Sequence, residues 1–173
     1  MDAFGLDAYR DQLERLYRKC FAGPPWFEPE DRLADFHGRL ARHLSNKGAS
    51  GVIVTDAGAL VGAVYGWPAG DVLARGTPFD DALANAVTPA VGQRLLAPAV
   101  VVAELMVDPQ RQRRGIGRAL LTRYVGDWPS AWLVTRPDAP AATLYRQEGW
   151  RQECEFDIEF HPMVLFTWQS PSG

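Results

Sequence analysis

The chain has 173 residues, of which 47% are hydrophobic and 23% charged, which is ordinary for a globular protein, so we expect a single domain over residues 1–173. The formal net charge of −3 argues against nonspecific nucleic-acid binding, which requires a basic face. There is no run of about 18 apolar residues, so neither a membrane span nor a membrane partner is expected.

The sequence shows neither the pattern of a signal peptide nor that of a metal site. Residues 1–5 contain neither the basic nor the apolar region of a signal peptide. Without such a signal, the widely separated Cys20 and Cys154 are interpreted as free thiols in a reducing cytosol, and a cytoplasmic protein is expected. The three histidines show no zinc spacing with cysteines or carboxylates, so no metal is expected.

The first half of the chain is predicted to contain helices followed by a hairpin. Residues 7–21, and a segment that starts near Pro29, repeat apolar residues at helical spacing. Two strands, 51–55 and 60–67, flank the turn at 56–59. The stretch 68–99 holds two further predicted helices, at 80–86 and 89–96, and long connections of this kind often serve as substrate lids.

The second half of the chain alternates strands and helices. The pattern predicts a strand at 100–107, a helix at 116–126, a strand at 131–135, a helix at 140–148 and final strands at 150–159 and 162–168. This order predicts a mixed α/β fold with a largely antiparallel sheet and one helix that binds phosphate after a central strand.

The segment between the strand 100–107 and the helix 116–126 is the most informative. It reads Val-Asp-Pro-Gln-Arg-Gln-Arg-Arg-Gly-Ile-Gly-Arg over residues 107–118. Gly115 and Gly117 let the backbone bend and let a ligand approach, while the first helical turn leaves N–H groups unpaired and the arginines add charge. The segment therefore predicts a phosphate site without a metal. It is not a Walker loop, because neither Lys-Ser nor Lys-Thr follows the glycines.

Two motifs together resemble the GNAT superfamily of acetyltransferases. Gln-x-x-Gly-x-Gly behind Val-Asp-Pro resembles the acyl-coenzyme A loop of that family. Residues 138–150 resemble its Asn-x-x-Ala-x-x-(Leu/Phe)-Tyr-x-x-x-Gly-Phe motif, with Asp138 in the place of Asn and Trp150 in the place of Phe. The resemblance covers roughly residues 7–168 and implies the GNAT fold, α/β (α+β) with a mixed, mostly antiparallel sheet of about six to seven strands flanked by helices. The family usually opens with a strand, which is here either very short or truncated.

The resemblance implies acetyl-CoA or coenzyme A as the co-substrate. Backbone groups of Met106 and Val107 would bind the pantetheine arm like an added strand, and one N–H would polarise the thioester carbonyl. The pyrophosphate would be bound by Gln112, Arg113, Arg114, Gly115, Ile116, Gly117 and Arg118. Asp138 stands at a position that contacts the cofactor in the family, but a carboxylate cannot donate the hydrogen bonds of an amide, so we favour a cap on the helix that begins near Pro140.

Two residues are candidates for the chemistry. Glu104 lies on the strand before the loop and could accept the ammonium proton of an amine, or it could be a structural carboxylate that pairs with an arginine. Tyr145 matches the family tyrosine that protonates the leaving thiolate. The alternative is an aromatic residue packed in the core, and the spacing to Gly149 favours the acid role.

The acceptor is less well defined by the sequence. Its pocket is expected from residues 23–31, 65–92 and the last hairpin, where aromatic residues beside carboxylates could hold a cation or could simply be core. These residues are Trp26, Phe27, Tyr65, Trp67 and Phe79, with Glu28, Glu30, Asp31, Asp71, Asp80 and Asp81.

The resulting expectation is an N-acetyltransferase that moves an acetyl group from acetyl-CoA to a primary amine of a small molecule by direct attack. The alternatives are an aminoglycoside-type enzyme, a protein or peptide N-acetyltransferase, and an acyl-CoA-binding module without catalysis. The GNAT fold often pairs through edge strands, so a homodimer is compatible with the resemblance.

Overall fold

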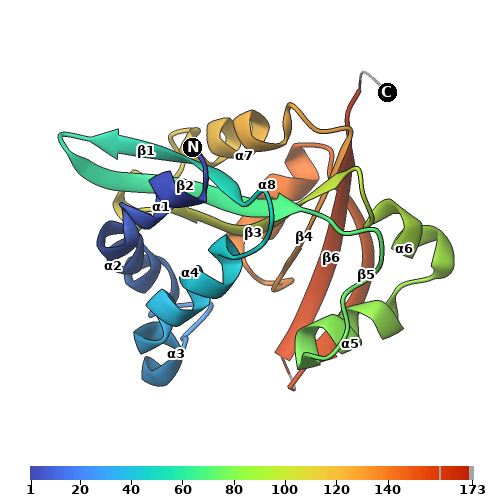
Figure 1. Ribbon diagram of the computed structural model, residues 1–173. Helices are drawn as coiled ribbons and strands as arrows, with labels where there is room; N and C mark the ends of the chain where they lie inside the picture. Colours follow the sequence, from blue (N-terminus) through green and yellow to red (C-terminus); the bar gives the residue numbers. More distant parts are fainter. Residues whose placement is uncertain (160, 172–173) are drawn as a thin grey trace. The chain divides into compact units, whose positions relative to one another are not determined.

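The computed structural model describes residues 1–159 and 161–171, and its chain divides into two compact units (Figure 1). Unit 1 comprises Met1–Trp67 and Val102–Val125, and unit 2 comprises Pro68–Val101 and Gly126–Gly173. The strand β3 (Ala99–Val107) therefore begins in unit 2 and ends in unit 1. The single domain expected over residues 1–173 stays a prediction.

The strands follow the order β1-β2-β3-β4-β6-β5 in a six-stranded sheet. Antiparallel ladders join β1 to β2, β4 to β6 and β5 to β6, whereas β3 and β4 pair in parallel from Ala99↔Ser130 to Val101↔Trp132. The predicted mixed, mostly antiparallel α/β sheet is confirmed. The remaining strands are β1 (Ser50–Asp56), β2 (Ala59–Pro68), β4 (Ser130–Thr135), β5 (Arg151–Ile158) and β6 (His161–Gln169).

Unit 1 differs from the prediction at three places. Its helices are α1 (Ala3–Asp7), α2 (Arg10–Phe21), α3 (Glu30–Ala34), α4 (Phe36–Leu44), the 3₁₀ turn η1 (Pro109–Arg111) and α7 (Ile116–Val125). The helix expected at 7–21 begins at Arg10 and follows a separate, unpredicted helix at Ala3–Asp7. The strand expected before the first helix is represented by Asp2 alone, which forms an isolated antiparallel bridge to Ser50. The helix expected from Pro29 onward is two helices, because ψ at Asp35 is 8° instead of the roughly −42° of an α-helix.

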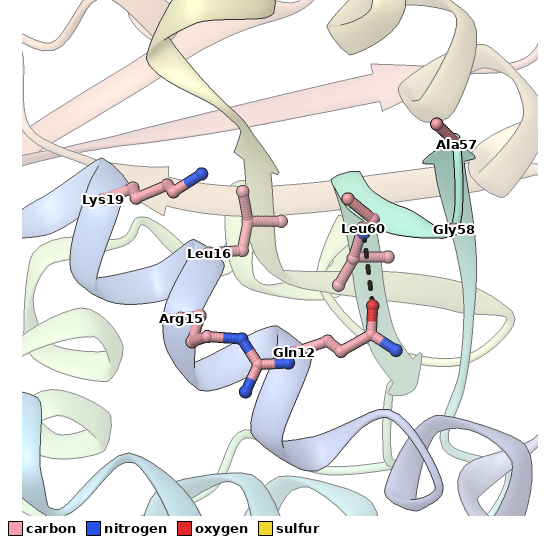
Figure 2. A pocket seen from close by; sticks show the side chains of 8 residues that line it. Gln12, Arg15, Leu16, Lys19, Ala57, Gly58 and Leu60 are labelled. Atoms are coloured by element: carbon pink, nitrogen blue, oxygen red, sulfur yellow. Dashed lines mark hydrogen bonds between the residues drawn. The ribbon is translucent and has the colours of Figure 1, made fainter.

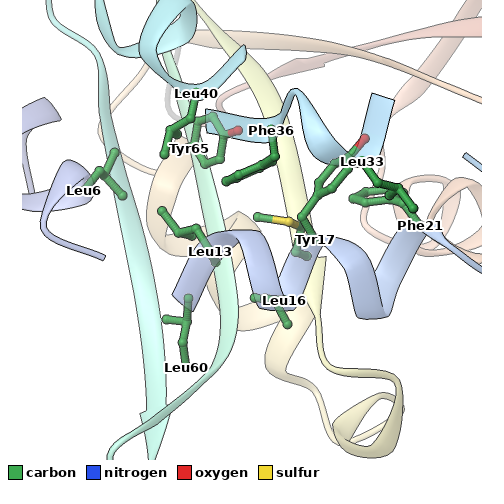
Figure 3. Packing of buried hydrophobic residues seen from close by; sticks show 12 residues of the cluster. Leu6, Leu13, Leu16, Tyr17, Phe21, Leu33, Phe36, Leu40, Leu60 and Tyr65 are labelled. Atoms are coloured by element: carbon green, nitrogen blue, oxygen red, sulfur yellow. The ribbon is translucent and has the colours of Figure 1, made fainter. Parts of the chain in front are cut away.

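The core of unit 1 lies between these helices and the β1–β2 hairpin (Figure 3). Apolar side chains of α2 and α4 pack there on Leu60 and Tyr65 of β2. The hairpin turn has positive φ at Ala57 and Gly58, as two-residue turns between antiparallel strands require. A Cβ on Gly62 of β2 would lie 3.0 Å from side-chain atoms of Ile116 and of Leu120, so this glycine lets α7 pack closely.

Unit 2 carries α5 (Pro78–Ala86), α6 (Pro89–Arg94) and α8 (Pro140–Gln147). Thr77 and Thr88 cap the first two helices, and a core of Leu83, Leu95 and Leu165 packs between these helices and the strands. Both helices predicted within residues 68–99 are confirmed. In the described part of the chain, no helix is long and apolar enough to cross a bilayer.

Candidate active site

The predicted phosphate loop has the backbone of an anion site. Arg113 and Gly115 adopt φ of 60° and 79°, and α7 then begins at Ile116. The amide of Ala119 donates to the Gly115 carbonyl at 2.9 Å, so the N–H groups of the preceding turn have no acceptor within the helix. A Cβ on Gly115 would meet no atom within 4 Å, which leaves the approach to this turn open. The helix start therefore suits a phosphate group.

The arginines of the loop divide into two kinds. Arg111 lies with its Nη2 atom 2.6 Å from Asp56 of β1 and holds the loop to the hairpin. Arg113 and Arg114 are exposed, and neither has an acidic partner among residues 1–159 and 161–171. These two side chains are therefore the ones best placed to bind an external anion.

Asp108 anchors the start of the loop. Its carboxylate accepts from Lys19 Nζ at 2.7 Å and from the Gln110 amide at 3.0 Å, and its own amide donates to the Val61 carbonyl at 2.9 Å. The Lys19 hydrogen bond holds the pKa of the Asp108 carboxyl below its usual range, although burial opposes it. Sequence reasoning assigned no role to this residue, because Lys19 lies 89 positions away.

The carbonyl of Val107 is already engaged within unit 1. It accepts from Cys20 Sγ at 3.4 Å and from Gln112 Nε2 at 3.2 Å, and a carbonyl oxygen has two lone pairs. Met106 is buried, with 1% of its surface exposed. The contacts expected from Met106 and Val107 to pantetheine, and from Gln112 to pyrophosphate, stay predictions.

Glu104 is the titratable group with the perturbation expected of a general base. Burial raises the pKa of its carboxyl to about 7, and Arg39 opposes this shift while Glu28 adds to it. A base with a pKa near the working pH is effective in proton transfer. Burial also raises the pKa of Tyr17 and Tyr65, and the negative charge of Glu104 adds to both shifts.

The buried polar atoms of unit 1 without a hydrogen-bond partner include Glu28 Oε2, Arg39 Nε and Nη2, His43 Nδ1 and Tyr65 Oη. Glu28, Arg39 and Tyr65 interact electrostatically with Glu104, and the His43 ring centroid lies 5.9 Å from that of Tyr65. The Arg39 guanidinium lies over the Tyr17 ring, with Cζ 4.2 Å from its centroid. Glu28 and Tyr65 were expected at the acceptor pocket, whereas Arg39 and His43 were missed. The sequence could have indicated both, because they follow Phe36 and Leu40 by three residues and so lie on the buried face of the helix.

The site residues expected in unit 2 have different surroundings. Tyr145 is buried, with its ring centroid 5.7 Å from that of Trp150 and 5.6 Å from that of Phe166. This packing leaves its acid role a prediction. The helix cap expected at Asp138 is wrong, because Ala139 occupies the cap position of α8 without a side-chain bond. Arg136 donates to both Asp138 carboxylate oxygens, at 3.0 and 3.1 Å. The carboxylate therefore pairs with Arg136 instead of capping the helix.

Asp80 and Asp81 of the 68–99 stretch serve local structure. Asp80 accepts from the Thr77 hydroxyl at 2.6 Å in the first turn of α5, and Asp81 accepts from the Gly76 amide at 3.3 Å. Phe79 packs against the core of unit 2. In the described residues, no group of three histidine, cysteine or acidic side chains could hold a metal ion.

A hollow of about 460 Å³ lies elsewhere in unit 1, between α2 and the hairpin turn (Figure 2). It is lined by Gln12, Arg15, Leu16, Lys19, Ala57, Gly58, Ala59 and Leu60. The Leu60 amide donates to Gln12 Oε1 at 3.2 Å across one side of it. Apart from Lys19, which anchors Asp108, its lining contains none of the site residues described above.

Comparisons with solved structures support the fold. Solved structures with a similar fold include an acetyltransferase from Thermus thermophilus (15% identity, 95% of this chain and 92% of that chain covered, TM-score 0.64). The PaiA N-acetyltransferase of Thermoplasma acidophilum, solved with coenzyme A, is 11% identical (98% and 96%, TM-score 0.60). Aminoglycoside 6′-acetyltransferase type Ii is 14% identical (98% and 94%, TM-score 0.64). No match is found among curated proteins.

The family comparison is more specific. The model of the acetyltransferase (GNAT) domain matches residues 48–152, which is more than half of the chain. The matched segment includes β1, β2, Glu104, the loop at 107–118 and α8. The chain therefore belongs to the GNAT acetyltransferase family.

Proposed function

We propose that the protein is an N-acetyltransferase that transfers the acetyl group of acetyl-CoA to a primary amine of a small molecule. The observation that carries this proposal is the joining of two features in one short segment. Glu104, with a pKa of about 7, lies on β3, and the loop at 107–118 joins this strand to the open helix start at Gly115 and Ile116. A proton acceptor and an anion site are thus consecutive features of the chain.

Acetyl-CoA supplies an activated thioester, and the residues of the chain supply the rest. The amides at the start of α7, with Arg113 and Arg114, bind the pyrophosphate. Met106 and Val107 orient the pantetheine arm through their backbone. Glu104 as a carboxylate accepts the ammonium proton, so that the neutral nitrogen attacks the thioester carbonyl.

The remaining steps concern the leaving group. The nitrogen–carbon bond forms as the carbon–sulfur bond breaks, and a β3 N–H stabilises the charge that develops on the carbonyl oxygen. Tyr145 donates its proton to the departing thiolate as the general acid. The products are the N-acetylated amine and coenzyme A.

Release of coenzyme A in the presence of amine panels tests the reaction. Free thiol should appear with at least one of the amino acid, polyamine or aminoglycoside classes, and mass spectrometry should show the acetylated amine. Thiol released with peptides alone would favour the protein N-acetyltransferase instead. If bound acetyl-CoA persists with every class, the protein is an acyl-CoA-binding module and the catalytic proposal fails.

The variant Gly117→Asp tests the coenzyme site separately. It places negative charge at the helix start, and coenzyme A affinity measured by calorimetry should fall by at least roughly tenfold. Thr122→Asp adds the same charge farther along α7 and serves as the control. Unchanged affinity in Gly117→Asp would contradict the loop assignment.

A further inference from the structure

The polar cluster around Glu104 draws on five separate parts of unit 1. Tyr17 comes from α2, Glu28 from the segment before α3, Arg39 from α4, Tyr65 from β2 and Glu104 from β3. Tyr17 and Tyr65 belong to the packed group of Figure 3, each with 1% of its surface exposed. Glu28, Arg39 and Glu104 are half-buried, so the cluster lies at the margin of the core of the unit.

The unpartnered atoms of this cluster are of two opposite kinds. Arg39 Nε and Nη2 can only donate hydrogen bonds, and Glu28 Oε2 can only accept one when ionised. The Tyr65 hydroxyl can do either, and it too is buried without a partner. Each such group destabilises the fold when it is buried unsatisfied. Within the described residues, Arg39 forms no ion pair with Glu28 or Glu104, so the two kinds do not satisfy each other.

Arg39 is the cation of this cluster. Burial disfavours its charge, but Glu104, Tyr17 and Tyr65 together keep its pKa above the ordinary value. His43, its neighbour one turn along α4, has a pKa lowered to about 4 by burial and by the charges of Arg39 and Arg42, so it is neutral near pH 7. Arg39 thus offers unpartnered donors and Glu28 an unpartnered acceptor, so a ligand that completes the cluster must carry both an acceptor and a donor.

We propose that the amine acceptor is a zwitterion of the amino-acid type, with its carboxylate bound by Arg39 and its ammonium facing Glu28 and Glu104. This inference rests on the proposed function and names its substrate class. The guanidinium fork suits a carboxylate with two parallel hydrogen bonds, and stacking on Tyr17 fixes the plane of the fork. The same arrangement holds the amine beside the group that accepts its proton.

The first test compares substrates on the wild-type protein. For each side chain in a panel, kinetics are measured with the amino acid, its carboxamide and the amine that lacks the carboxylate. We expect kcat/KM for the amino acid to exceed that of both analogues by on the order of tenfold to 100-fold, as a lost charged hydrogen bond implies. Equal values for all three would overturn the inference and leave the proposed acetyl transfer standing.

The second test uses Arg39→Met, with Arg39→Lys as a milder variant. Arg39→Met should lower kcat/KM for the amino acid more than for the amine, so that the preference disappears. The value for the amine should also fall, because Arg39 lowers the pKa of Glu104. The matched control is Arg42→Met, because Arg42 lies on the same helix, is exposed and bonds to Asp35. A preference that persists in both Arg39 variants would contradict the assignment.

A binding measurement keeps the test independent of turnover and of the folding of the variants. Calorimetry of the wild-type protein with coenzyme A present should show tighter binding of the amino acid than of its amine analogue. Equal affinity, or no binding of either, would overturn the inference. Failure of acetyl transfer to every class of amine would instead reject the proposed function itself.

Discussion

Each unit of the molecule contains a shielded glutamate on a strand, and the two have opposite surroundings. In unit 2, the Glu153 side chain on β5 is 3% exposed, and its carboxylate accepts from Thr167 Oγ1 at 2.6 Å. Arg94 Nη2 lies 2.8 Å and Arg151 Nε 3.6 Å from the same group. In unit 1, Glu104 lies beside unpartnered atoms of Glu28 and Arg39.

Under the proposed function, this difference is the one expected between a structural carboxylate and a catalytic one. A buried carboxylate with a hydroxyl and two guanidinium partners links α6, β5 and β6, and its hydrogen-bonding capacity is largely used within the protein. The partners of the Glu104 cluster are incomplete, so the fold maintains it at a cost in stability. Such unsatisfied groups are expected where a ligand completes the set.

Glu104→Gln should give the largest effect. Loss of the general base lowers turnover by roughly 10²–10⁴-fold. The free energy of unfolding should stay the same or rise, because the variant removes a carboxylate from a site where its charge is disfavoured. Coenzyme A release and urea unfolding measure the two quantities, with the exposed Glu155→Gln as control. Retained turnover together with marked destabilisation would make Glu104 a structural carboxylate.

Glu153→Gln should show the reverse pattern. It leaves Arg94 without its charged partner, and we expect the free energy of unfolding to fall by about 2 kcal/mol, less than for a fully buried pair because Arg94 is 30% exposed. Turnover per folded molecule should change by less than roughly twofold. An unfolding curve that coincides with that of the wild type would remove the contrast between the two glutamates.

Tyr145→Phe asks whether unit 2 contributes to the chemistry. If Tyr145 is the acid, turnover should fall by roughly tenfold while the affinity for coenzyme A stays nearly unchanged. Trp150→Phe, which alters the same aromatic group without removing a hydroxyl, controls for packing. An unaltered rate in Tyr145→Phe would assign this tyrosine to the core alone.

Local patterns in the sequence predicted the local structure well. The hairpin, the helices of the 68–99 stretch and the glycine turn before Ile116 depend on residues that are near neighbours in the chain. The break at Asp35 was missed because the apolar spacing continues through it, from Leu33 to Phe36. The ψ angle of Asp35 interrupts the helix there without changing the spacing of the apolar residues.

Contacts between distant segments could not be predicted in the same way. The Lys19–Asp108 pair joins residues 89 positions apart, and nothing in the sequence around either residue indicates the other. Arg39 resembles an ordinary surface charge in the sequence, and only the packing of α4 on Tyr17 buries it. The position of Asp138 before Pro140 predicted a helix cap, but in the structure its carboxylate pairs with Arg136.

The dependence of kcat/KM on pH tests the central role of Glu104 most directly. Because burial raises its pKa to about 7, the base is protonated and inactive below this value and ionised above it. The wild-type rate should therefore rise with pH and level off above a pKa of about 7, and this step should be absent in Glu104→Gln. A step near pH 7 that is identical in both proteins would contradict the account.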